Sequence, residues 1–294
     1  MDNSQPVSKM HGCGNDFVVY VDLDEQTTPE EVKKMCASHT GVGADGVIAV
    51  IKSRVPEAKY RMKYFNADGS VGQMCGNGIR CFAKYLVDNG LVTEGKIPVD
   101  TDAGMIVPEV LENTPREAIV KVNMGRPILQ DIKQVTLPAD KDGLVHVPFQ
   151  KLTGTYIGMG NPHVIFFVEK GKAEQYVKEY GSQIEHMTAT FPTKTNVEFV
   201  EINNRKDLTM HVWERAVGLT LACGTGACAT LVAAVLQGFA ETQAKVHLPG
   251  GTLEISWEGK DAPVFMTGPA TNVFNIQNLQ ELLLDAKKTK KPLG

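Results

Sequence analysis

Hydrophobic residues follow the chain in many short runs rather than in long repeats of a single period. Runs of strand length occupy residues 17–21, 47–51, 60–64, 118–122, 164–168, 196–202, 208–213 and 253–257. Because β-branched and aromatic residues are frequent in these runs and turn-forming residues separate them, each run predicts a β-strand.

Two longer segments, 79–89 and 227–237, favour helices instead. A glycine, Gly90 or Gly238, directly follows each segment, and glycine just past the last turn is a common helix stop. The apolar stretch 219–236 has the length of a membrane span, but it contains two glycines and three threonines and no charged anchor at its C-terminal end. We therefore expect a buried core helix there. Strands outnumber helices, and the pattern predicts an α+β fold.

Two short motifs occur once in each half of the chain, in the same order. A Gly-Asn pair ends at Asn15 and again at Asn161, 146 positions later, and a Cys-Gly-x-Gly motif begins at Cys75 and again at Cys223, 148 positions later. A predicted strand follows each Gly-Asn pair, and a predicted helix follows each cysteine motif. This self-similarity indicates a duplicated unit.

The duplication predicts two pseudo-symmetric halves, each a mixed, mostly antiparallel sheet wrapped around a central helix. Gly and Pro interrupt the pattern near residues 124–127, where we expect the joint. The prediction is an N-terminal half at 1–124, with 272–294 packing back on it, and a C-terminal half at 125–271. The active site is expected in the cleft between them.

Composition and charge narrow the class of protein. The 294 residues are 43% hydrophobic and 22% charged with a net charge of −4, which is typical of an ordinary globular chain of one large or two smaller domains. The near-neutral balance argues against a nucleic-acid surface, and the basic stretch 287–291 is expected to be a solvated terminus. The N-terminus lacks the pattern of a signal peptide. We expect a cytoplasmic protein without membrane contact.

Six cysteines raise the question of disulfides and metals. They are Cys13, Cys36, Cys75, Cys81, Cys223 and Cys228. A chain of this length needs no covalent staples, so reduced thiols are expected. The cysteine spacings do not match those of common zinc sites, and no metal is predicted. Cys81 and Cys228 are expected to pack in the core, and Cys13 and Cys36 to be structural.

The remaining two cysteines, Cys75 and Cys223, stand where the two predicted helices begin. A helix N-terminus offers unpaired N–H groups and partial positive charge, which lower the pKa of a thiol there and can bind a carboxylate. The adjacent glycines let a ligand approach the backbone. Each motif could thus be a thiol acid or base beside an anion site. The alternative is a buried structural cysteine at a tight turn.

Two such thiols on opposite sides of a bound molecule could invert a carbon centre. One thiolate would remove a proton from one face while the other thiol protonates the opposite face, and the roles would reverse in the other direction. Helix N-termini aimed at the substrate carboxylate would stabilise the carbanion-like intermediate. This chemistry needs no pyridoxal phosphate, and no cofactor is predicted.

Beyond these inferences, several segments together resemble the motifs of diaminopimelate epimerases. They are MHGCGNDF at 10–17, GVGADG at 41–46, FNADGS at 65–70, MCGNGIRC at 74–81, GNPH at 160–163, NVEF at 196–199, WER at 213–215, ACGTGAC at 222–228, LPGG at 248–251 and MTGPA at 266–270. The matches run over nearly the whole chain and are specific in combination.

The resemblance implies interconversion of L,L- and meso-diaminopimelate in lysine and cell-wall precursor synthesis. It implies that Cys75 and Cys223 are the acid and base, assisted by His163 and Glu214. The residues implied to bind the substrate's distal end or to frame the site are Asn15, Asn66, Asn161, Asn196 and Arg215, and Glu214 is implied to bind substrate as well. Those implied to hold the α-carboxylate are Gly76, Asn77, Gly224 and Thr225.

The chain departs from the family pattern at two positions. The family usually has Gly after Glu-Arg, whereas this chain has Ala216; if the position needs a positive φ, alanine is strained there. Many relatives carry Tyr near the end of the last strand, where it serves dimer contacts, whereas Phe274 stands here. A homodimer is still expected, without that hydroxyl.

Three alternative functions compete with this interpretation of the sequence. Proline or hydroxyproline racemases share the fold and thiols, but typically have His where Asn77 stands and lack Glu-Arg before the second cysteine. Phenazine-type isomerases lack the cysteine pair. A redox-sensing or binding protein could instead form a reversible disulfide between Cys75 and Cys223.

Overall fold

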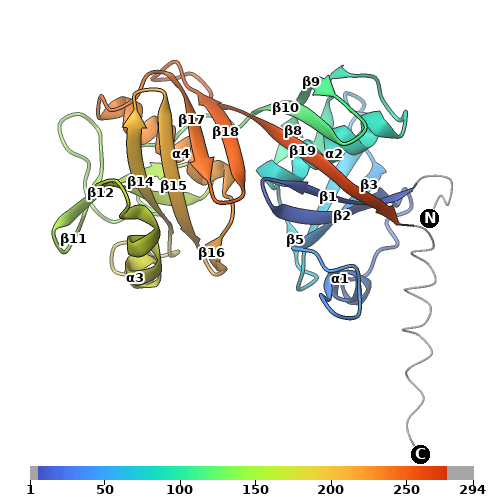
Figure 1. Ribbon diagram of the computed structural model, residues 1–294, viewed down its shortest axis with the longest axis horizontal. Helices are drawn as coiled ribbons and strands as arrows, with labels where there is room; N and C mark the ends of the chain where they lie inside the picture. The colour runs from blue at the N-terminus through green and yellow to red at the C-terminus, as the bar shows by residue number, and fades with distance from the viewer. Residues whose placement is uncertain (1–5, 277–294) are drawn as a thin grey trace, which may run out of the picture. The chain divides into compact units, whose positions relative to one another are not determined.

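The computed structural model describes residues 6–276, and in it the chain forms two compact units (Figure 1). Of the described residues, those up to 122 and from 269 onward form the first unit, and residues 123–268 form the second. The predicted tail at 287–291 lies outside the described residues.

The first unit is built mainly from the N-terminal part of the chain, and the end of the last strand completes it. Its elements are β1 (Val7–Gly12), β2 (Asn15–Val21), α1 (Pro29–Cys36), β3 (Gly46–Lys52), β4 (Tyr60–Asn66), β5 (Val71–Gly72), α2 (Gly76–Asp88), β6 (Gly95–Lys96), β7 (Val99–Thr101), β8 (Gly104–Ile106), β9 (Glu109–Asn113) and β10 (Glu117–Asn123). The long strand β19 (Phe265–Ile276) begins in the second unit and pairs with β1 in the first.

The second unit continues the chain with a similar succession. Its elements are β11 (His146–Phe149), β12 (Leu152–Gly158), β13 (Pro162–Val168), α3 (Ala173–Glu185), β14 (Asn196–Asn204), β15 (Asp207–Glu214), β16 (Gly218–Thr220), α4 (Gly224–Leu236), β17 (Gln243–Leu248) and β18 (Gly251–Ser256).

Strand pairing repeats step by step between the units. In the first, β1–β2 is antiparallel, β2–β3 parallel, β3–β4 and β4–β5 antiparallel, β4–β7 parallel and β7–β8 antiparallel. In the second, β12–β13 is antiparallel, β13–β14 parallel, β14–β15 and β15–β16 antiparallel, β15–β17 parallel and β17–β18 antiparallel. The predicted duplication and the mixed, mostly antiparallel sheets are confirmed.

One helix forms the core of each unit. In α2 every residue from Asn77 to Leu86 is buried, and α4 is buried from Gly226 to Ala234 as well as at Gly224. A helix that is buried around its whole circumference belongs in a core. Helix α4 packs against β12, β13, β14, β15, β17 and β18. The expected core helix at 219–236 is therefore present from Gly224 onward, and no described helix is long and apolar enough to cross a membrane.

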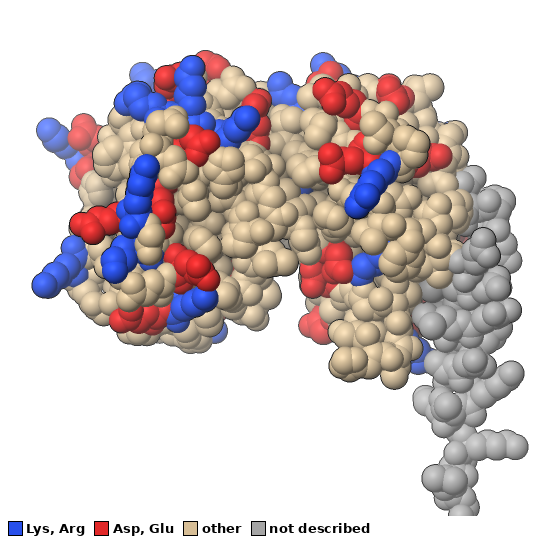
Figure 2. All heavy atoms as spheres, viewed as in Figure 1, with Lys and Arg blue, Asp and Glu red and all other residues tan. Residues whose placement is uncertain are grey.

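Helices α1 and α3 were not predicted. Helix α1 has clear local signals, because Thr28 and Glu31 form a reciprocal capping box and Pro29 occupies the first turn. Both helices lie outside the repeated motifs and have polar surfaces, so their apolar residues are spaced too widely to stand out as runs. On the face shown in Figure 2, positive and negative side chains are interspersed, as on an ordinary solvated surface.

Candidate active site

Cys75 and Cys223 have the same backbone role in the two units. Each is the N-cap of a central helix, in extended conformation, with φ −136° and ψ 121° at Cys75 and φ −125° and ψ 110° at Cys223. The sulfur accepts a hydrogen bond from the N–H three residues on, at 3.4 Å from Gly78 N and 3.4 Å from Gly226 N. A thiol thus fills the place that Ser, Thr or Asp usually holds at an N-cap.

The glycines at the third helical position make room for these sulfurs. A Cβ built on Gly78 would lie 3.3 Å from the Cys75 Cβ, and one on Gly226 would lie 3.3 Å from both Cβ and Sγ of Cys223. Such distances are tighter than ordinary carbon contacts. The second glycine of each Cys-Gly-x-Gly motif therefore allows the capping cysteine to pack closely against the first turn of its helix.

Side-chain amides surround Cys75. Its thiol donates to Asn15 Oδ1 at 3.6 Å, and Asn77 Nδ2 donates to the same oxygen at 3.2 Å. Asn15 Nδ2 in turn donates to Asp45 Oδ2 at 2.9 Å. The structure thus brings Asn15 and Asn77 to Cys75. Asn66 is instead engaged in its own turn, where Nδ2 donates to Ser70 Oγ at 2.9 Å.

Arg80 supports this site and was not singled out from the sequence. The fully buried side chain donates to Asn77 Oδ1 at 3.0 Å, to Gly76 O at 3.1 Å and to Pro269 O at 3.0 Å. The guanidinium therefore orients both the Asn77 amide and the first turn of α2. An arginine between the apolar residues Ile79 and Cys81 near the start of a core helix is the signal that could have identified it.

A chain of polar side chains leads away from Cys223. Its Sγ lies 3.4 Å from Thr225 Oγ1, which accepts from Asn161 Nδ2 at 3.4 Å. Asn161 Oδ1 lies 3.0 Å from His163 Nε2, and His163 Nδ1 lies 2.6 Å from Glu198 Oε1. The structure thus brings together three predicted residues, Asn161, His163 and Thr225, with Glu198, which was not assigned a role from the sequence.

Glu214 completes the surroundings of Cys223. It ends β15 and accepts from Thr220 Oγ1 at 2.6 Å. Burial raises the pKa of the Glu214 carboxyl, although hydrogen bonds from Thr220 and Cys223 oppose the shift.

The pKa of the Cys223 thiol is raised well above 9.0, mainly because the side chain is buried and secondarily because Glu214 and Glu198 repel a thiolate. Hydrogen bonds from Thr225 and Gly226 lower the pKa but do not offset these causes. The expectation of a lowered pKa at this helix start is therefore wrong for Cys223. Desolvation and nearby carboxylates outweigh the helix end.

Asn196 and Arg215 form a frame at the end of β15. Asn196 Nδ2 donates to Pro162 O at 2.8 Å, and its Oδ1 accepts from Arg215 N at 2.9 Å. The Arg215 guanidinium donates to Thr193 O at 3.2 Å. Ala216 follows with φ 63°, in the left-handed region. The substitution noted in the sequence thus falls at a position that favours glycine.

One group of described residues has donor atoms close enough for a metal ion. Atoms of His163, Glu198 and Cys223 lie within 4.8 Å of one another, and thiol, imidazole and carboxylate together suit zinc. Nδ1 of His163 and Oε1 of Glu198 are, however, already hydrogen-bonded to each other at 2.6 Å. The prediction that the protein needs no metal stays a prediction.

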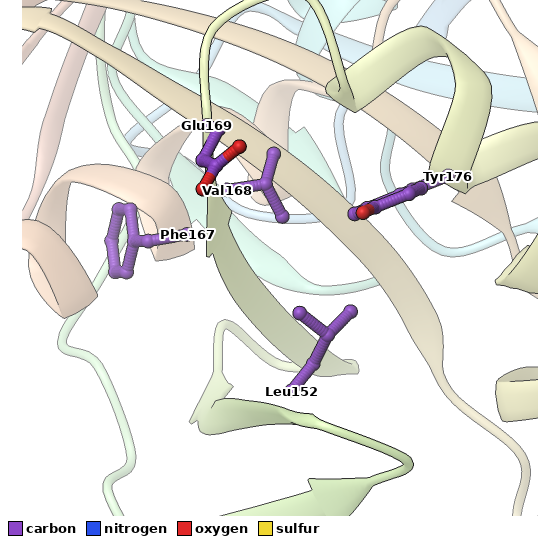
Figure 3. A pocket seen from close by; sticks show the side chains of 5 residues that line it. All are labelled: Leu152, Phe167, Val168, Glu169 and Tyr176. Carbon is purple, nitrogen blue, oxygen red and sulfur yellow. The ribbon is translucent and has the colours of Figure 1, made fainter.

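A separate hollow on the second unit is lined by Leu152, Phe167, Val168, Glu169 and Tyr176 (Figure 3). Its lining is largely apolar and includes one carboxylate and no thiol or imidazole. It therefore offers neither the thiol nor the imidazole that are found together around Cys223.

Comparison with known proteins gives a consistent result. A family model described as diaminopimelate epimerase matches residues 7–130 and 155–273. The diaminopimelate epimerase of Halothermothrix orenii is 44% identical over 277 residues, covering 91% of this chain and 95% of the relative. That of Synechocystis sp. is 43% identical over 279 residues, covering 92% and 97%. The chloroplastic diaminopimelate epimerase of Oryza sativa subsp. japonica is 44% identical over 281 residues, covering 90% and 78%.

Solved structures resemble the fold at much lower identity. A hydroxyproline epimerase from Agrobacterium vitis, with trans-4-hydroxy-L-proline bound, has a TM-score of 0.64 at 13% identity, covering 92% of this chain and 90% of that one. A PhzF-family phenazine biosynthesis protein from Bacillus anthracis has a TM-score of 0.62 at 18% identity, covering 93% and 99%. These similarities concern the fold alone.

Proposed function

The chain belongs to the diaminopimelate epimerase family, and from this premise we propose how its residues carry out the reaction. The activity is that of an isomerase in lysine biosynthesis, from a family that works without pyridoxal phosphate. Family membership decides against the proline racemase and phenazine-type alternatives. We propose that Cys75 and Cys223 are the acid and base, and that the substrate's α-carbon lies between them in a cleft between the two units.

The proton transfers follow from the two thiols. One sulfur, as thiolate, takes the α-proton from one face, and the other, as thiol, gives its proton to the opposite face. One C–H bond breaks and another forms. The α-proton of the substrate ends on the first sulfur, and the proton of the second sulfur ends on the α-carbon. The observation that carries this proposal is the identical placement of Cys75 and Cys223 at the N-caps of equivalent buried helices.

Cys223 begins as the acid in this proposal, since burial and two carboxylates keep its pKa high. Glu214 accepts its proton when Cys223 must become the base, because the carboxyl is hydrogen-bonded to the thiol and its own pKa is raised toward that task. His163 assists as a neighbour through Asn161 and Thr225.

The two helix starts hold the α-carboxylate in the proposal. Backbone N–H groups near Gly76 and Asn77 and near Gly224 and Thr225 lie in the first turns of α2 and α4. Such groups bind anions and stabilise the negative charge that grows on the carboxylate when the α-proton leaves. Pyridoxal phosphate has no part in this scheme.

Polar side chains bind or frame the substrate's distal end. We assign this role to Asn15, Asn66, Asn161, Asn196, Glu214 and Arg215. Arg215 supplies a forked donor for the distal carboxylate, and the bond between its N–H and Asn196 fixes the backbone from which it reaches. Amide groups of the asparagines add donors and acceptors without a competing charge.

We also propose that the protein forms a homodimer and that it works in the cytoplasm, which is a reducing compartment. The side chains of Val273 and Phe274 are 51% and 50% exposed on β19, which gives the strand an apolar edge for a second copy. We expect all six cysteines to be reduced, as suits such a compartment.

Exchange of the α-proton in D₂O tests the function directly. Fully reduced enzyme without added pyridoxal phosphate is incubated with L,L-diaminopimelate and, separately, with proline. Deuterium at the α-carbon and meso product from diaminopimelate alone are expected. Exchange with proline instead, or no exchange with either substrate while the thiols titrate as free, would refute the assignment.

A further inference from the structure

The internal repeat places different side chains at equivalent positions beside the two cysteines. In the first unit, the parallel pair β2–β3 begins with Phe17 opposite Gly46. In the second, the parallel pair β13–β14 begins with His163 opposite Asn196. His163 is thus the counterpart of Phe17.

The same register makes Glu198 the counterpart of Ile48, each two residues further along its strand. A Cβ built on Gly78 would lie 3.1 Å from Ile48 Cδ1, and a Cβ built on Gly226 would lie 2.6 Å from Glu198 Oε1. Each side chain therefore packs against the first turn of the helix that its cysteine caps.

The fold itself does not require an ionisable pair at this place. Phe17 and Ile48 fill it in the first unit with apolar groups that are fully buried. His163 and Glu198 fill it in the second, also with no exposed surface, and Glu198 Oε2 has no hydrogen-bond partner. Burying a carboxyl group is costly when an apolar side chain would fit. A role in the chemistry of Cys223 explains why the pair is there.

The hydrogen bonds define where the protons of the pair lie. Asn161 donates through Nδ2 to Thr225, so its Oδ1 accepts, and His163 Nε2 must be the donor in the 3.0 Å contact. Nδ1 lies 2.6 Å from Glu198 Oε1, and this contact holds one proton, on nitrogen or on oxygen. The imidazole therefore presents an N–H from Nε2 and keeps Nδ1 engaged.

We propose that Glu198 is a positioning residue of the Cys223 half of the active site, which fixes His163 as an Nε2–H donor through the proton shared with Nδ1. The inference rests on the proposed function. Sulfur, imidazole and carboxylate atoms lie within 4.8 Å of one another, so the imidazole and carboxyl groups lie beside the thiol that gains and loses the proton. Burial raises the pKa of Glu198, which keeps the shared proton in place.

The test replaces Glu198 by the residue that occupies the equivalent position in the first unit. Glu198→Ile copies Ile48 and removes the carboxyl group, whereas Glu198→Gln keeps a hydrogen-bonding group. We expect Glu198→Ile to fold with an unchanged or higher melting temperature and to lower kcat about 10- to 100-fold, with KM within about threefold. Glu198→Gln should lose less, because its amide can donate to Nδ1.

Glu201→Gln is the matched control on the same strand. Glu201 Oε1 accepts from Ala173 N at the start of α3, at 2.9 Å, away from Cys223, and a glutamine oxygen can keep that bond. Its kcat should stay within about twofold of the parent.

The ¹⁵N spectrum of the His163 ring supplies a readout that needs no substrate. The parent protein should show one fixed form protonated at Nε2, assigned by its loss in His163→Gln, and Glu198→Ile should show exchanging tautomers. An unchanged spectrum, or full kcat in a folded Glu198→Ile protein, would overturn the proposal. If the parent does not epimerise diaminopimelate, the proposed function fails, while the spectrum still decides the role of Glu198.

Discussion

Cys75 and Cys223 share a backbone position but have neighbours of different charge. Cys75 donates to the neutral amide of Asn15, whereas burial, reinforced by Glu214 and Glu198, raises the pKa of Cys223. A helix N-terminus stabilises a thiolate by an amount comparable to one exposed charge, and full burial opposes it more strongly. The repeat therefore supplies two equivalent sulfurs, and the side chains around them make the sulfurs unequal.

Removal of either sulfur should abolish most of the activity. Cys75→Ala and Cys223→Ala each remove one proton carrier, and general acid–base groups contribute about 10²- to 10⁴-fold to rate. We expect kcat for epimerisation to fall by that order in both directions, as measured by circular dichroism of the product or by coupled assay.

The neighbouring cysteines in the same helices are the controls for these variants. Cys81 and Cys228 lie in α2 and α4 and are fully buried. Cys81→Ala and Cys228→Ala should lower the free energy of unfolding while leaving kcat within about twofold. Racemising activity that persists in Cys75→Ala would contradict the two-thiol mechanism.

Ala216 carries backbone strain that glycine would relieve. Its φ of 63° lies in the left-handed region, where a Cβ costs about 1–2 kcal/mol. Glycine's greater freedom in the unfolded chain cancels part of the gain, so Ala216→Gly should raise the free energy of unfolding by up to about 1 kcal/mol in urea titration. The Ala216 N–H bond to Glu185 Oε1 at 2.9 Å should be retained.

The reverse substitution close by tests this explanation. Gly218 has φ 101°, so Gly218→Ala should destabilise the protein. A neutral or destabilising Ala216→Gly substitution would show that the loop has adapted to alanine.

Among the elements, those with dense apolar runs were predictable and those defined by tertiary contacts were not. Strands β3 and β14 bury long runs of successive residues, β10 alternates buried and less buried residues, and glycines closely follow α2 and α4, which the chain shows directly. Two-residue strands such as β5 and β6 exist only because a neighbour pairs with them. Glu198 was hidden for the same reason, since only the fold brings its carboxyl group to His163.

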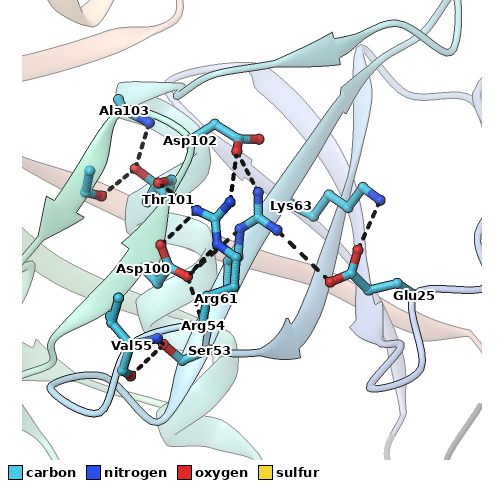
Figure 4. Close-up of polar contacts among 11 residues, drawn as sticks. Glu25, Ser53, Arg54, Val55, Arg61, Lys63, Asp100, Thr101, Asp102 and Ala103 are labelled. Carbon is cyan, nitrogen blue, oxygen red and sulfur yellow. Dashed lines mark hydrogen bonds and ion pairs between the residues drawn. The ribbon is translucent and has the colours of Figure 1, made fainter.

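Short strands of the first unit are joined by an ion-pair network (Figure 4). Strands β4 and β7 pair through only two positions, Tyr60 with Val99 and Arg61 with Asp100. Arg54 adds a bidentate contact to Asp100, with Nε to Oδ2 and Nη2 to Oδ1 both at 3.0 Å. The Asp100 side chain is 6% exposed but that of Arg54 is 53% exposed, so these bonds are worth more than those of a fully exposed pair but are partly screened by solvent.

Asp100→Asn should destabilise the first unit in a pH-dependent manner. Hydrogen bonds from Arg54 hold the pKa of Asp100 below 3.8, so the carboxylate's contribution is present above that pH and is lost as pH falls through the lower folded-state pKa. We expect a loss of about 1 kcal/mol at pH 7, which shrinks as the pH falls below 3.8, from urea unfolding.

Asp24→Asn serves as the exposed control for this network. Asp24 lies 3.8 Å from Lys52, and their side chains are 64% and 72% exposed, so its loss should be within about 0.5 kcal/mol over the same pH range. Equal losses for Asp24 and Asp100, or a loss at Asp100 that does not change with pH, would show that the network does not act through the carboxylate charge.

On the scale of the whole molecule, the chain builds one enzyme from two copies of a unit. The repeated motifs revealed the duplication because thiol caps and their glycines must be kept in each copy. Differences between the copies, such as His163 and Glu198 against Phe17 and Ile48, carry the division of labour. The hydrophobic periodicity of the sequence does not reveal these differences, because each is a single residue within an apolar run.

Mild oxidation tests whether the two units bring their sulfurs together. Diamide should join Cys75 and Cys223 in a disulfide, taking two electrons and releasing both thiol protons, and epimerase activity should disappear with it. Cys75 is the only partly exposed cysteine in the described structure, and the proposed mechanism places Cys223 on the other side of the substrate carbon, so peptide mapping should find no disulfide that involves Cys13, Cys36, Cys81 or Cys228. Dithiothreitol should restore activity, which makes the disulfide an inactive state rather than the purpose of the site. Loss of activity with both sulfurs reduced, or a Cys75 link to another cysteine, would contradict a cleft that holds one substrate carbon between the two thiols.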